Sequence, residues 1–344
     1  FDFKWKGKQL PEGADAIAPT DYNNITFTLK YIDSVNDRWK LNQPIPEYAK
    51  NIIVEDVQNV DSVKEKVDLV FCALNMDKDE IIKIEELYAK SEVVVVSNNS
   101  AHRWTEDVPM LMPEINSHHL EAIQAQKDRL GTKKGFIIVK PNCSIQSYVP
   151  ALNALKDFGL EKVVVSTYQA ISGSGKNFSD WPEMVDNVIP FISGEEAKSE
   201  LEPLKIWGTF DGKKFVNASE PIISAQCIRV PVLDGHLATV SVKFKEKPSK
   251  EEIIKRWKEY RSEIEKYQLP LSPNKFLTYF EEENRPQTKL DRDLYNGMGI
   301  SIGRLREDNI YDYKFVCLSH NTLRGAAGGA LLGAELLKAK GLLD

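Results

Sequence analysis

The sequence predicts an α/β fold that combines a Rossmann-like parallel sheet with a second, mixed α+β domain. Three features of the chain lead to this expectation. Its 344 residues exceed what one hydrophobic core usually organises. Residues 51–139 alternate apolar runs with amphipathic segments, as strand–helix–strand units of a parallel sheet do. Beyond residue 160 the candidate strands indicate a sheet with one polar face.

The first half of the chain supplies the elements of the parallel sheet. Apolar, β-branched runs predict strands at residues 52–54, 68–74, 91–97 and 135–139. Helical spacing of apolar residues predicts helices at residues 79–90 and 113–130, the second ending before Gly131. Among the first forty residues only 25–31 resembles a strand, and no glycine-rich phosphate loop follows it.

The second half predicts a mixed sheet and a long last helix. Strands are expected at residues 163–168, 238–244 and 315–318, and helices at 145–158, 250–268 and 322–340. The last helix is rich in small residues and can return to the first domain. We therefore expect a nucleotide-binding domain of residues 1–142 plus 321–344, and a second domain of residues 143–320.

Composition and charge argue against several classes of function. The formal net charge of −6 disfavours a nucleic-acid-binding protein, because phosphate backbones need a basic surface. No apolar run approaches the roughly 18 residues of a membrane span, so no membrane association is expected. The four cysteines lack CxxC spacing, which disfavours a metal site. Scattered free thiols are typical of a reducing compartment, and we expect a cytoplasmic protein.

The segment PNCS, residues 141–144, places a cysteine between a predicted strand and a predicted helix. The positive end of a helix dipole stabilises a thiolate, which makes Cys143 a candidate nucleophile for acyl transfer. A buried and inert structural cysteine explains the same pattern equally well. This segment alone leaves both interpretations open.

A second cluster, residues 226–236, brings Arg229 and His236 to one bend of the chain. A histidine can take a proton from a thiol and later return one to a substrate. An arginine can hold a carboxylate by two parallel hydrogen bonds. Taken separately, a turn histidine and a surface ion pair are the simpler explanations, so the prediction depends on their combination with Cys143.

Six segments in a common order and spacing resemble the aspartate-semialdehyde dehydrogenase family, in its archaeal and fungal branch. They are SNxxxxR (97–103), PNCS (141–144), QAISGxG (169–175), GEExK (194–198), RVxVxDGH (229–236) and HNTxxGAAG (320–328). The resemblance extends from about residue 45 to residue 344. Six concordant segments are far more specific than any one of them.

The resemblance implies a role for each matching residue. Cys143 would be the nucleophile, His236 the acid/base, and Gln169 would orient the thioester. The expected substrate-binding residues are Arg103 and Lys198 for the phosphate, Glu195 for the ammonium group, Arg229 for the distal carboxylate, and Asn142. The residues expected at the nicotinamide end of the cofactor are Ser172, Gly173 and Asn321. For Lys198 a solvated surface is the simpler alternative, and for Gly325, Gly328 and Gly329 it is close helix packing.

The implied reaction is the reductive dephosphorylation of 4-aspartyl phosphate to aspartate 4-semialdehyde through a cysteine thioester. It is a step of lysine, diaminopimelate, threonine, methionine and isoleucine biosynthesis. NADPH is the expected cofactor, with NADH as the alternative, and a homodimer or homotetramer is the expected assembly. The glycine-rich cofactor loop of the family is absent, and residues 33–38 match its serine-rich segment only distantly. No residue is therefore assigned to the cofactor phosphates.

Other interpretations remain open at this point. Malonyl-CoA reductase, or another acyl-CoA reductase on the same scaffold, shares the thioester chemistry, although Asn142 and Glu195 match the aspartyl-type enzymes. A non-catalytic, cofactor-deficient homologue would explain the missing loop, although the reactive residues are all present. A glyceraldehyde-3-phosphate-type dehydrogenase fits less well, because it gives no role to the GEEAK segment or the DGH bend.

Overall fold

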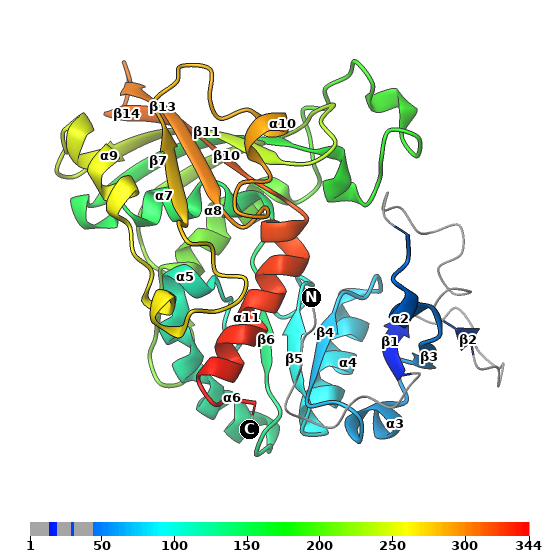
Figure 1. The fold of residues 1–344 in the computed structure, drawn as a ribbon. Helices are drawn as coiled ribbons and strands as arrows, with labels where there is room; N and C mark the ends of the chain where they lie inside the picture. The colour runs from blue at the N-terminus through cyan, green and yellow to red at the C-terminus, as the bar shows by residue number, and fades with distance from the viewer. Residues whose placement is uncertain (1–13, 19–28, 31–43, 344) are drawn as a thin grey trace.

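The computed structural model describes residues 14–18, 29–30 and 44–343 of the chain. They form a six-stranded mixed sheet with helices beneath it and a smaller parallel sheet lower in the molecule (Figure 1). The long helix α11 (Gly328–Ala339) starts near the mixed sheet and runs down beside the parallel one. Within the described ranges, no helix is both long and apolar enough to cross a bilayer.

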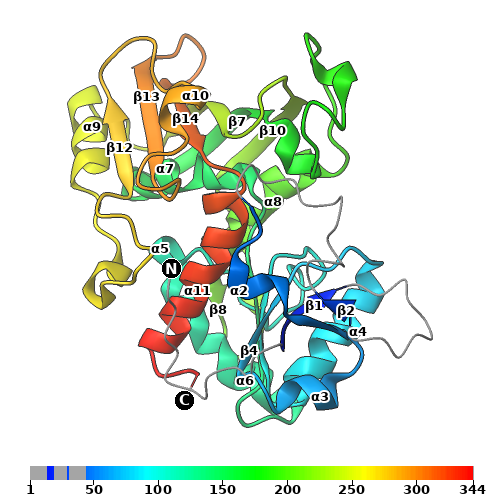
Figure 2. The same ribbon diagram turned by 45° about the vertical axis from the view of Figure 1, so that its right-hand side comes forward.

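The parallel sheet has the order β4-β5-β6, with strands Leu69–Cys72, Val94–Ser97 and Ile137–Val139. Successive side chains of a strand point to opposite faces, so the run of four valines at 93–96 supplies two cores. Val95 packs in the cluster that includes Ile84 of α4 (Lys78–Lys90). Val96 packs in the cluster that includes Leu336 of α11. The two helices therefore cover opposite faces of the sheet, as Figure 2 shows.

The strand expected at residues 52–54 belongs to a different sheet. β3 (Ile53–Asp56) pairs in parallel with β1 (Ala14–Ala18) and antiparallel with β2 (Leu29–Lys30), and not with β4. The short helices α2 (Glu47–Lys50) and α3 (Val60–Lys64) flank β3. Most of the strand expected at 25–31, and all of the segment 33–38, lie outside the described residues.

The mixed sheet has the order β10-β7-β11-β14-β13-β12. Its strands are Ile222–Arg229, Leu160–Gln169, His236–Phe244, Tyr313–Ser319, Ile300–Glu307 and Leu277–Phe280. One face packs on helices α7 (Val149–Asn153), α8 (Glu195–Ile206) and α9 (Lys250–Glu259). On the other face the polar residues Ser166, Thr239 and Ser241 are partly exposed, in agreement with the predicted polar face, although the apolar Val164 and Ile222 are exposed there as well. The remaining short elements are β8 (Thr209–Phe210), β9 (Phe215–Val216), α10 (Thr288–Asp291), and 3₁₀ turns Ile171–Ser174 and Pro182–Met184.

Four long predicted helices are divided into shorter ones. The helix expected at 145–158 is a 3₁₀ turn Ser144–Gln146, then α7, then a 3₁₀ turn Lys156–Phe158. Pro150 is tolerated only in a first helical turn, so α7 starts anew beside it. The helix expected at 113–130 is divided into α5 (Pro113–Asn116), η2 (Ser117–Ala122) and α6 (Ile123–Leu130). The helix expected at 250–268 is divided into α9 and η7 (Glu263–Tyr267). The helix expected at 322–340 is divided into the π turn η8 (Leu323–Ala327) and α11.

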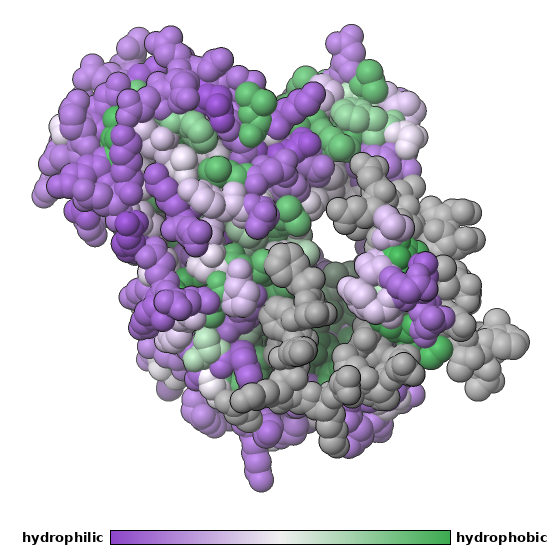
Figure 3. All heavy atoms as spheres, in the orientation of Figure 1, coloured by the Kyte–Doolittle hydropathy of each residue, from purple (hydrophilic) through white to green (hydrophobic). Residues whose placement is uncertain are grey.

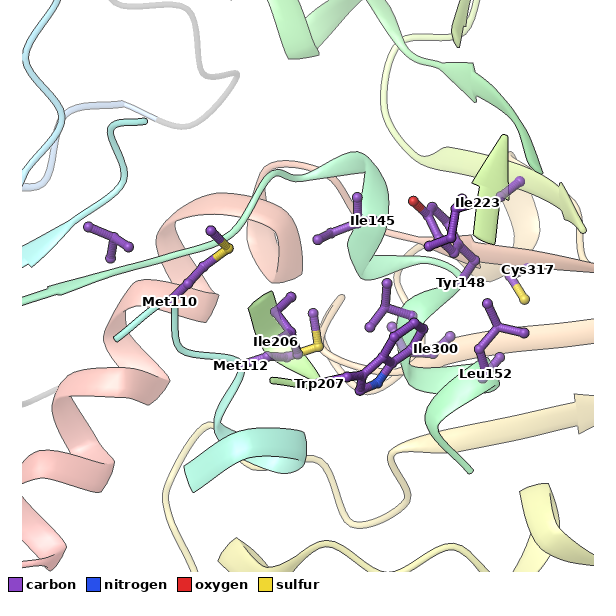
Figure 4. Packing of buried hydrophobic residues seen from close by; sticks show 14 of the residues in the cluster. Met110, Met112, Ile145, Tyr148, Leu152, Ile206, Trp207, Ile223, Ile300 and Cys317 are labelled. Atoms are coloured by element: carbon purple, nitrogen blue, oxygen red, sulfur yellow. The ribbon is translucent and has the colours of Figure 1, made fainter. Parts of the chain in front are cut away.

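The chain that follows Cys143 is anchored in the main core. Ile145, Tyr148 and Leu152 are fully buried and pack in the same cluster as Met110 and Trp207 (Figure 4). The outer surface over the mixed sheet and its helices is by contrast largely hydrophilic in the view of Figure 3. The turn that carries Cys143 therefore has little freedom to move relative to the mixed sheet.

Candidate active site

Three of the predicted site residues lie at the same end of three neighbouring strands of the mixed sheet. β7 and β10 run in parallel and both end there, with Gln169 opposite Arg229. β11 runs antiparallel to β7, with Leu237 opposite Tyr168, so the first residue of β11, His236, lies at the same end of the strands as Gln169. The strand directions thus gather three side chains that are far apart in the sequence.

The nucleophile turn, residues 141–144, follows the end of β6. The Asn142 Oδ1 atom accepts hydrogen bonds from the backbone N and the Oγ of Ser144, at 2.8 and 2.7 Å, which fixes the turn around Cys143. A Cβ atom added to Gly325 would lie 2.8 Å from the Cys143 Cβ. Gly325 was expected only to allow helix packing, but the structure shows that it lets η8 approach the candidate nucleophile.

The candidate nucleophile and the candidate acid/base face each other. The Cys143 Sγ lies 3.6 Å from Nε2 of His236, which is fully buried. Nδ1 of the ring accepts from the Ala170 backbone N at 3.1 Å, while the Gly235 carbonyl is a hydrogen-bond acceptor for the ring. With Ala170 as the donor, Nδ1 is unprotonated and the proton of the neutral ring lies on Nε2, which faces the Cys143 Sγ. Nε2 can take the thiol proton only in the other tautomer, with the proton on Nδ1.

The electrostatic environment favours a neutral pair. Burial, and after it the charge of Arg229, lowers the pKa of His236 to about 3. Burial raises the pKa of the Cys143 thiol, and the nearby ammonium group of Lys140 acts in the opposite direction. The prediction that a helix dipole stabilises the Cys143 thiolate is wrong, because only the three-residue turn Ser144–Gln146 follows Cys143. The resting state is thus a thiol beside a neutral imidazole.

A cleft of about 280 Å³ opens in front of Cys143. It is lined by Asn98, Asn99, Ser100, Arg103, Asn142, Cys143, Gln169, Gly173, Ile192, Glu195, Lys198 and Arg229. The structure therefore gathers Cys143, Gln169 and all five residues predicted to bind substrate around one space. An anionic substrate would meet three cationic side chains there, those of Arg103, Lys198 and Arg229.

Glu195 connects several of these side chains at the first turn of α8. Its Oε1 accepts from Asn142 Nδ2 at 3.0 Å and from Lys198 Nζ at 2.8 Å, and its Oε2 accepts from Gln169 Nε2 at 3.1 Å. The Lys198 side chain is about one-third exposed, so it reaches the cleft from its rim. Glu195 is the carboxylate in the lining of the cleft that can bind a substrate cation, and in the structure it is paired with Lys198.

Arg229 and Gly173 lie close to each other and to the His236 ring. Nη1 of Arg229 donates to the Ala170 carbonyl at 2.6 Å, which leaves other guanidinium N–H groups for a ligand. A Cβ on Gly173 would lie 2.9 Å from that Nη1 and 3.1 Å from two atoms of the His236 ring. A glycine at 173 is therefore what lets this turn lie against the reactive pair.

The residues expected at the nicotinamide end form one connected group. Asn321 donates through Nδ2 to the Ser172 Oγ at 2.8 Å and accepts from the Gly235 backbone N at 2.7 Å. This arrangement joins the turn that holds Gly173 to the residue before His236. The polar groups of Ser172 and Asn321, and the lack of a side chain at Gly173, fit a flat ring that carries an amide group, as nicotinamide does, beside Cys143 and His236.

Two buried charged residues of the site were not predicted. Glu202 on α8 pairs with Arg103, at 2.8 Å between Oε1 and Nη1. Lys140 lies at the end of β6, and its Nζ donates to the Pro141 carbonyl at 2.6 Å. Glu202 follows Glu195 by seven residues, two helical turns, so its place on the same helix face was a usable signal. Lys140 immediately precedes the PNCS segment but belongs to no motif that would single it out.

Comparisons with known proteins identify the family to which the chain belongs. The family model of the semialdehyde dehydrogenase NAD binding domain matches residues 21–123, and that of the dimerisation domain matches residues 152–324. The aspartate-semialdehyde dehydrogenase of Archaeoglobus fulgidus is 42% identical over 310 residues, which cover 90% of this chain and 86% of that protein. The enzyme of Aspergillus fumigatus is 40% identical over 323 residues, covering 91% and 87%.

Solved structures give the same result. The crystal structure of aspartate-semialdehyde dehydrogenase with NADP from Candida albicans superposes with a TM-score of 0.79 at 36% identity, covering 88% of this chain and 86% of that one. Aspartate-semialdehyde dehydrogenase II of Vibrio cholerae, at 22% identity and a TM-score of 0.65, shares the fold. The resemblance expected from the six segments is confirmed, and the chain belongs to the aspartate-semialdehyde dehydrogenase family.

Proposed function

We propose that this protein catalyses the NADPH-dependent reductive dephosphorylation of 4-aspartyl phosphate to aspartate 4-semialdehyde. The observation that carries the proposal is the 3.6 Å approach of the Cys143 Sγ to the His236 Nε2, at a cleft that Arg229 and Glu195 also line. Membership of the family, and the names of its members in archaea and fungi, support the same reaction.

Cys143 accepts the acyl group in the first half of the reaction. His236 takes the thiol proton at Nε2, with the Gly235 carbonyl stabilising the protonated ring. The thiolate attacks the acyl carbon, a carbon–sulfur bond forms, and the bond from this carbon to the phosphate oxygen breaks. Inorganic phosphate leaves with both electrons of that bond and a thioester remains. Arg103 and Lys198 line the cleft where this anion departs.

The second half of the reaction releases the aldehyde. NADPH, when bound, supplies the hydride that reduces the thioester carbon. Ser172, Gly173 and Asn321 would hold the nicotinamide end beside His236. Protonated His236 gives its proton to the oxygen of the reduced carbon, which makes a thiohemiacetal. As this thiohemiacetal collapses, the now neutral His236 takes the hydroxyl proton back, the carbon–sulfur bond breaks, and Cys143 is released as a thiolate.

Substrate recognition is assigned to the charged walls of the cleft. Arg229 binds the distal carboxylate with the guanidinium N–H groups that Ala170 does not use. Glu195 binds the substrate ammonium group in place of Lys198, which then pairs with phosphate. Gln169, which the Glu195 carboxylate holds, orients the thioester oxygen. One exchange of ion-pair partners thus accompanies binding.

Turnover with defined substrates tests the proposal. Purified protein is assayed with aspartate 4-semialdehyde, NADP and inorganic phosphate, and NADPH formation is followed by absorbance. NADPH formation that requires phosphate supports the proposal. Formation that requires CoA instead of phosphate would indicate the acyl-CoA reductase alternative. No turnover, and no binding of NADPH at millimolar concentration, would indicate the non-catalytic homologue, which the comparisons with named enzymes do not favour.

Three further properties belong to the same proposal. The domains comprise residues 1–142 plus 321–344 and residues 143–320. The second domain forms a homodimer or homotetramer, for which the match to a dimerisation domain and the open face of the mixed sheet are the support. The protein acts in the cytoplasm, where its free thiols at residues 72, 143, 227 and 317 stay reduced.

A further inference from the structure

Glu202 is a completely buried carboxylate, and each of its two oxygens accepts a hydrogen bond from a residue that lines the cleft. Oε1 accepts from Nη1 of Arg103 at 2.8 Å, and Oε2 accepts from the backbone N of Asn142 at 2.6 Å. A carboxylate removed from water is costly unless its oxygens are paired, and here both are. One partner is a cation at the cleft, and the other is the residue that precedes Cys143.

The same helix also holds the main chain around Arg103. Lys205 lies three residues after Glu202 on α8, and its Nζ donates to the carbonyls of Arg103 and Thr105, at 2.7 and 3.0 Å. Arg103 in turn donates through Nε to the Lys140 carbonyl at 3.0 Å. Its guanidinium is thus fixed in orientation as well as in place, and the N–H groups left over are directed by these bonds.

We propose that Glu202 is a positioning residue that ties the guanidinium of Arg103 to the nucleophile turn. One rigid carboxylate thereby sets the spacing between the place where a phosphate binds and the thiol that takes the acyl group. The inference rests on the proposed function in one respect, namely that Arg103 binds the phosphate. It assigns to Glu202 no contact with the substrate.

Two substitutions separate geometry from charge. Glu202→Gln keeps the length of the side chain, but its amide oxygen can accept from only one of the two partners. Glu202→Asp keeps the charge, but a side chain shorter by one methylene cannot reach both. A residue that only neutralised the charge of Arg103 would tolerate the aspartate, whereas a positioning residue tolerates neither.

The test measures initial rates with inorganic phosphate as the varied substrate. Both Glu202 variants are expected to lower kcat/KM for phosphate about ten- to a hundredfold, with KM for the aldehyde changed less than about threefold. Glu200→Gln is the matched control. Glu200 lies on the same helix, its Oε1 accepts from the Ala225 backbone N and from no other described residue, and a glutamine can still accept that bond. Its rates should stay within about twofold of wild type.

A double-mutant cycle shows whether Glu202 acts through Arg103. In an Arg103→Leu background, Glu202→Gln should change kcat/KM for phosphate less than about threefold, because the side chain it positions is gone. Equal effects in both backgrounds would overturn the proposal. So would wild-type kinetics with phosphate in both single variants.

A binding assay keeps the inference separate from the proposed function. Protection of Cys143 from iodoacetamide by inorganic phosphate needs no turnover and works with any variant that folds. If the wild-type protein is inactive, the proposed function fails, yet protection that is lost in Glu202→Asp still supports the inference. Unchanged protection in that variant refutes it.

Discussion

Gly325 offers a direct test of how closely the π turn η8 must approach the reactive thiol. In Gly325→Ala the new methyl group would lie 2.8 Å from the Cys143 Cβ and 3.2 Å from its Cα. Ordinary carbon–carbon contacts are about 3.5 to 4.0 Å, so Cys143 or η8 must move by about 0.7 to 1.2 Å. The neighbour is a short side chain on a turn anchored in the core, and it has no flexible end that can swing away.

The expected result is a loss of rate that exceeds the loss of stability. A displacement of about 1 Å at a reacting atom can cost roughly a hundredfold in rate, while overpacking of this size costs about 1 to 3 kcal/mol. The assay is kcat/KM for the aldehyde together with the thermal midpoint.

Gly333→Ala, on the helix α11 that directly follows η8, is the control. Its Cβ would lie 3.5 Å from the Ile138 Cδ1, an ordinary contact, and alanine favours the helix. This variant should keep full activity and gain slightly in stability. Full activity in Gly325→Ala would refute the close approach of η8 to Cys143.

Three other predictions concern the charged and reactive groups. Cys143→Ser should fold normally, as judged by its thermal midpoint, and lose activity about a thousandfold or more, and substantial turnover would reject Cys143 as nucleophile. Arg229→Leu should raise KM for the aldehyde about ten- to a hundredfold, and an unchanged KM would count against its role in carboxylate binding. Burial lowers the pKa of Lys140 to about 7, so between pH 7 and 10 the unfolded chain holds more protons than the folded one, and stability rises with pH. Wild-type protein should therefore gain roughly 1 kcal/mol per pH unit relative to Lys140→Met in denaturant titrations at pH 7.5 and 9, and a constant difference between the two would contradict the buried charge.

The elements that the sequence predicted well are those set by local pattern. The valine run at 93–96 was predicted as a buried strand, and the structure buries its alternate residues in two cores, as a continuous apolar run in a parallel sheet requires. The glycine at 131 ends α6 in the left-handed conformation that the residue type favours. Both depend on neighbours within a few residues, which a single sequence contains.

The parts that were missed depend on distant partners. The helix expected at 113–130 breaks where Asn116 turns to bond the main chain of Met110 and Met112. β3 takes its partner from residues 14–18, and no pattern in its own segment distinguishes that choice from pairing with β4. In each case a contact outside the local window decides between alternatives that the local pattern leaves equal.

The candidate site likewise has residues that local motifs identify and residues whose role depends on distant partners. The motifs singled out Cys143 and His236, and the fold places the Cys143 Sγ 3.6 Å from the His236 Nε2. Glu202 was missed because its partner Arg103 lies 99 residues away, and its position two helical turns after Glu195 indicates a shared helix face but not that partner. Gly325 was assigned only to helix packing because nothing in its segment indicates that Cys143 lies opposite.

The most direct test of the proposed chemistry is the identity of the acylated residue. Protein is mixed with aspartate 4-semialdehyde and NADP without phosphate, quenched in acid, digested and analysed by mass spectrometry. The aspartyl group is expected on the peptide that contains Cys143, together with one NADPH formed per site, and neither should be seen with Cys143→Ser. An acyl group on Cys72, Cys227 or Cys317, or NADPH formation that persists in the serine variant, would contradict the assignment.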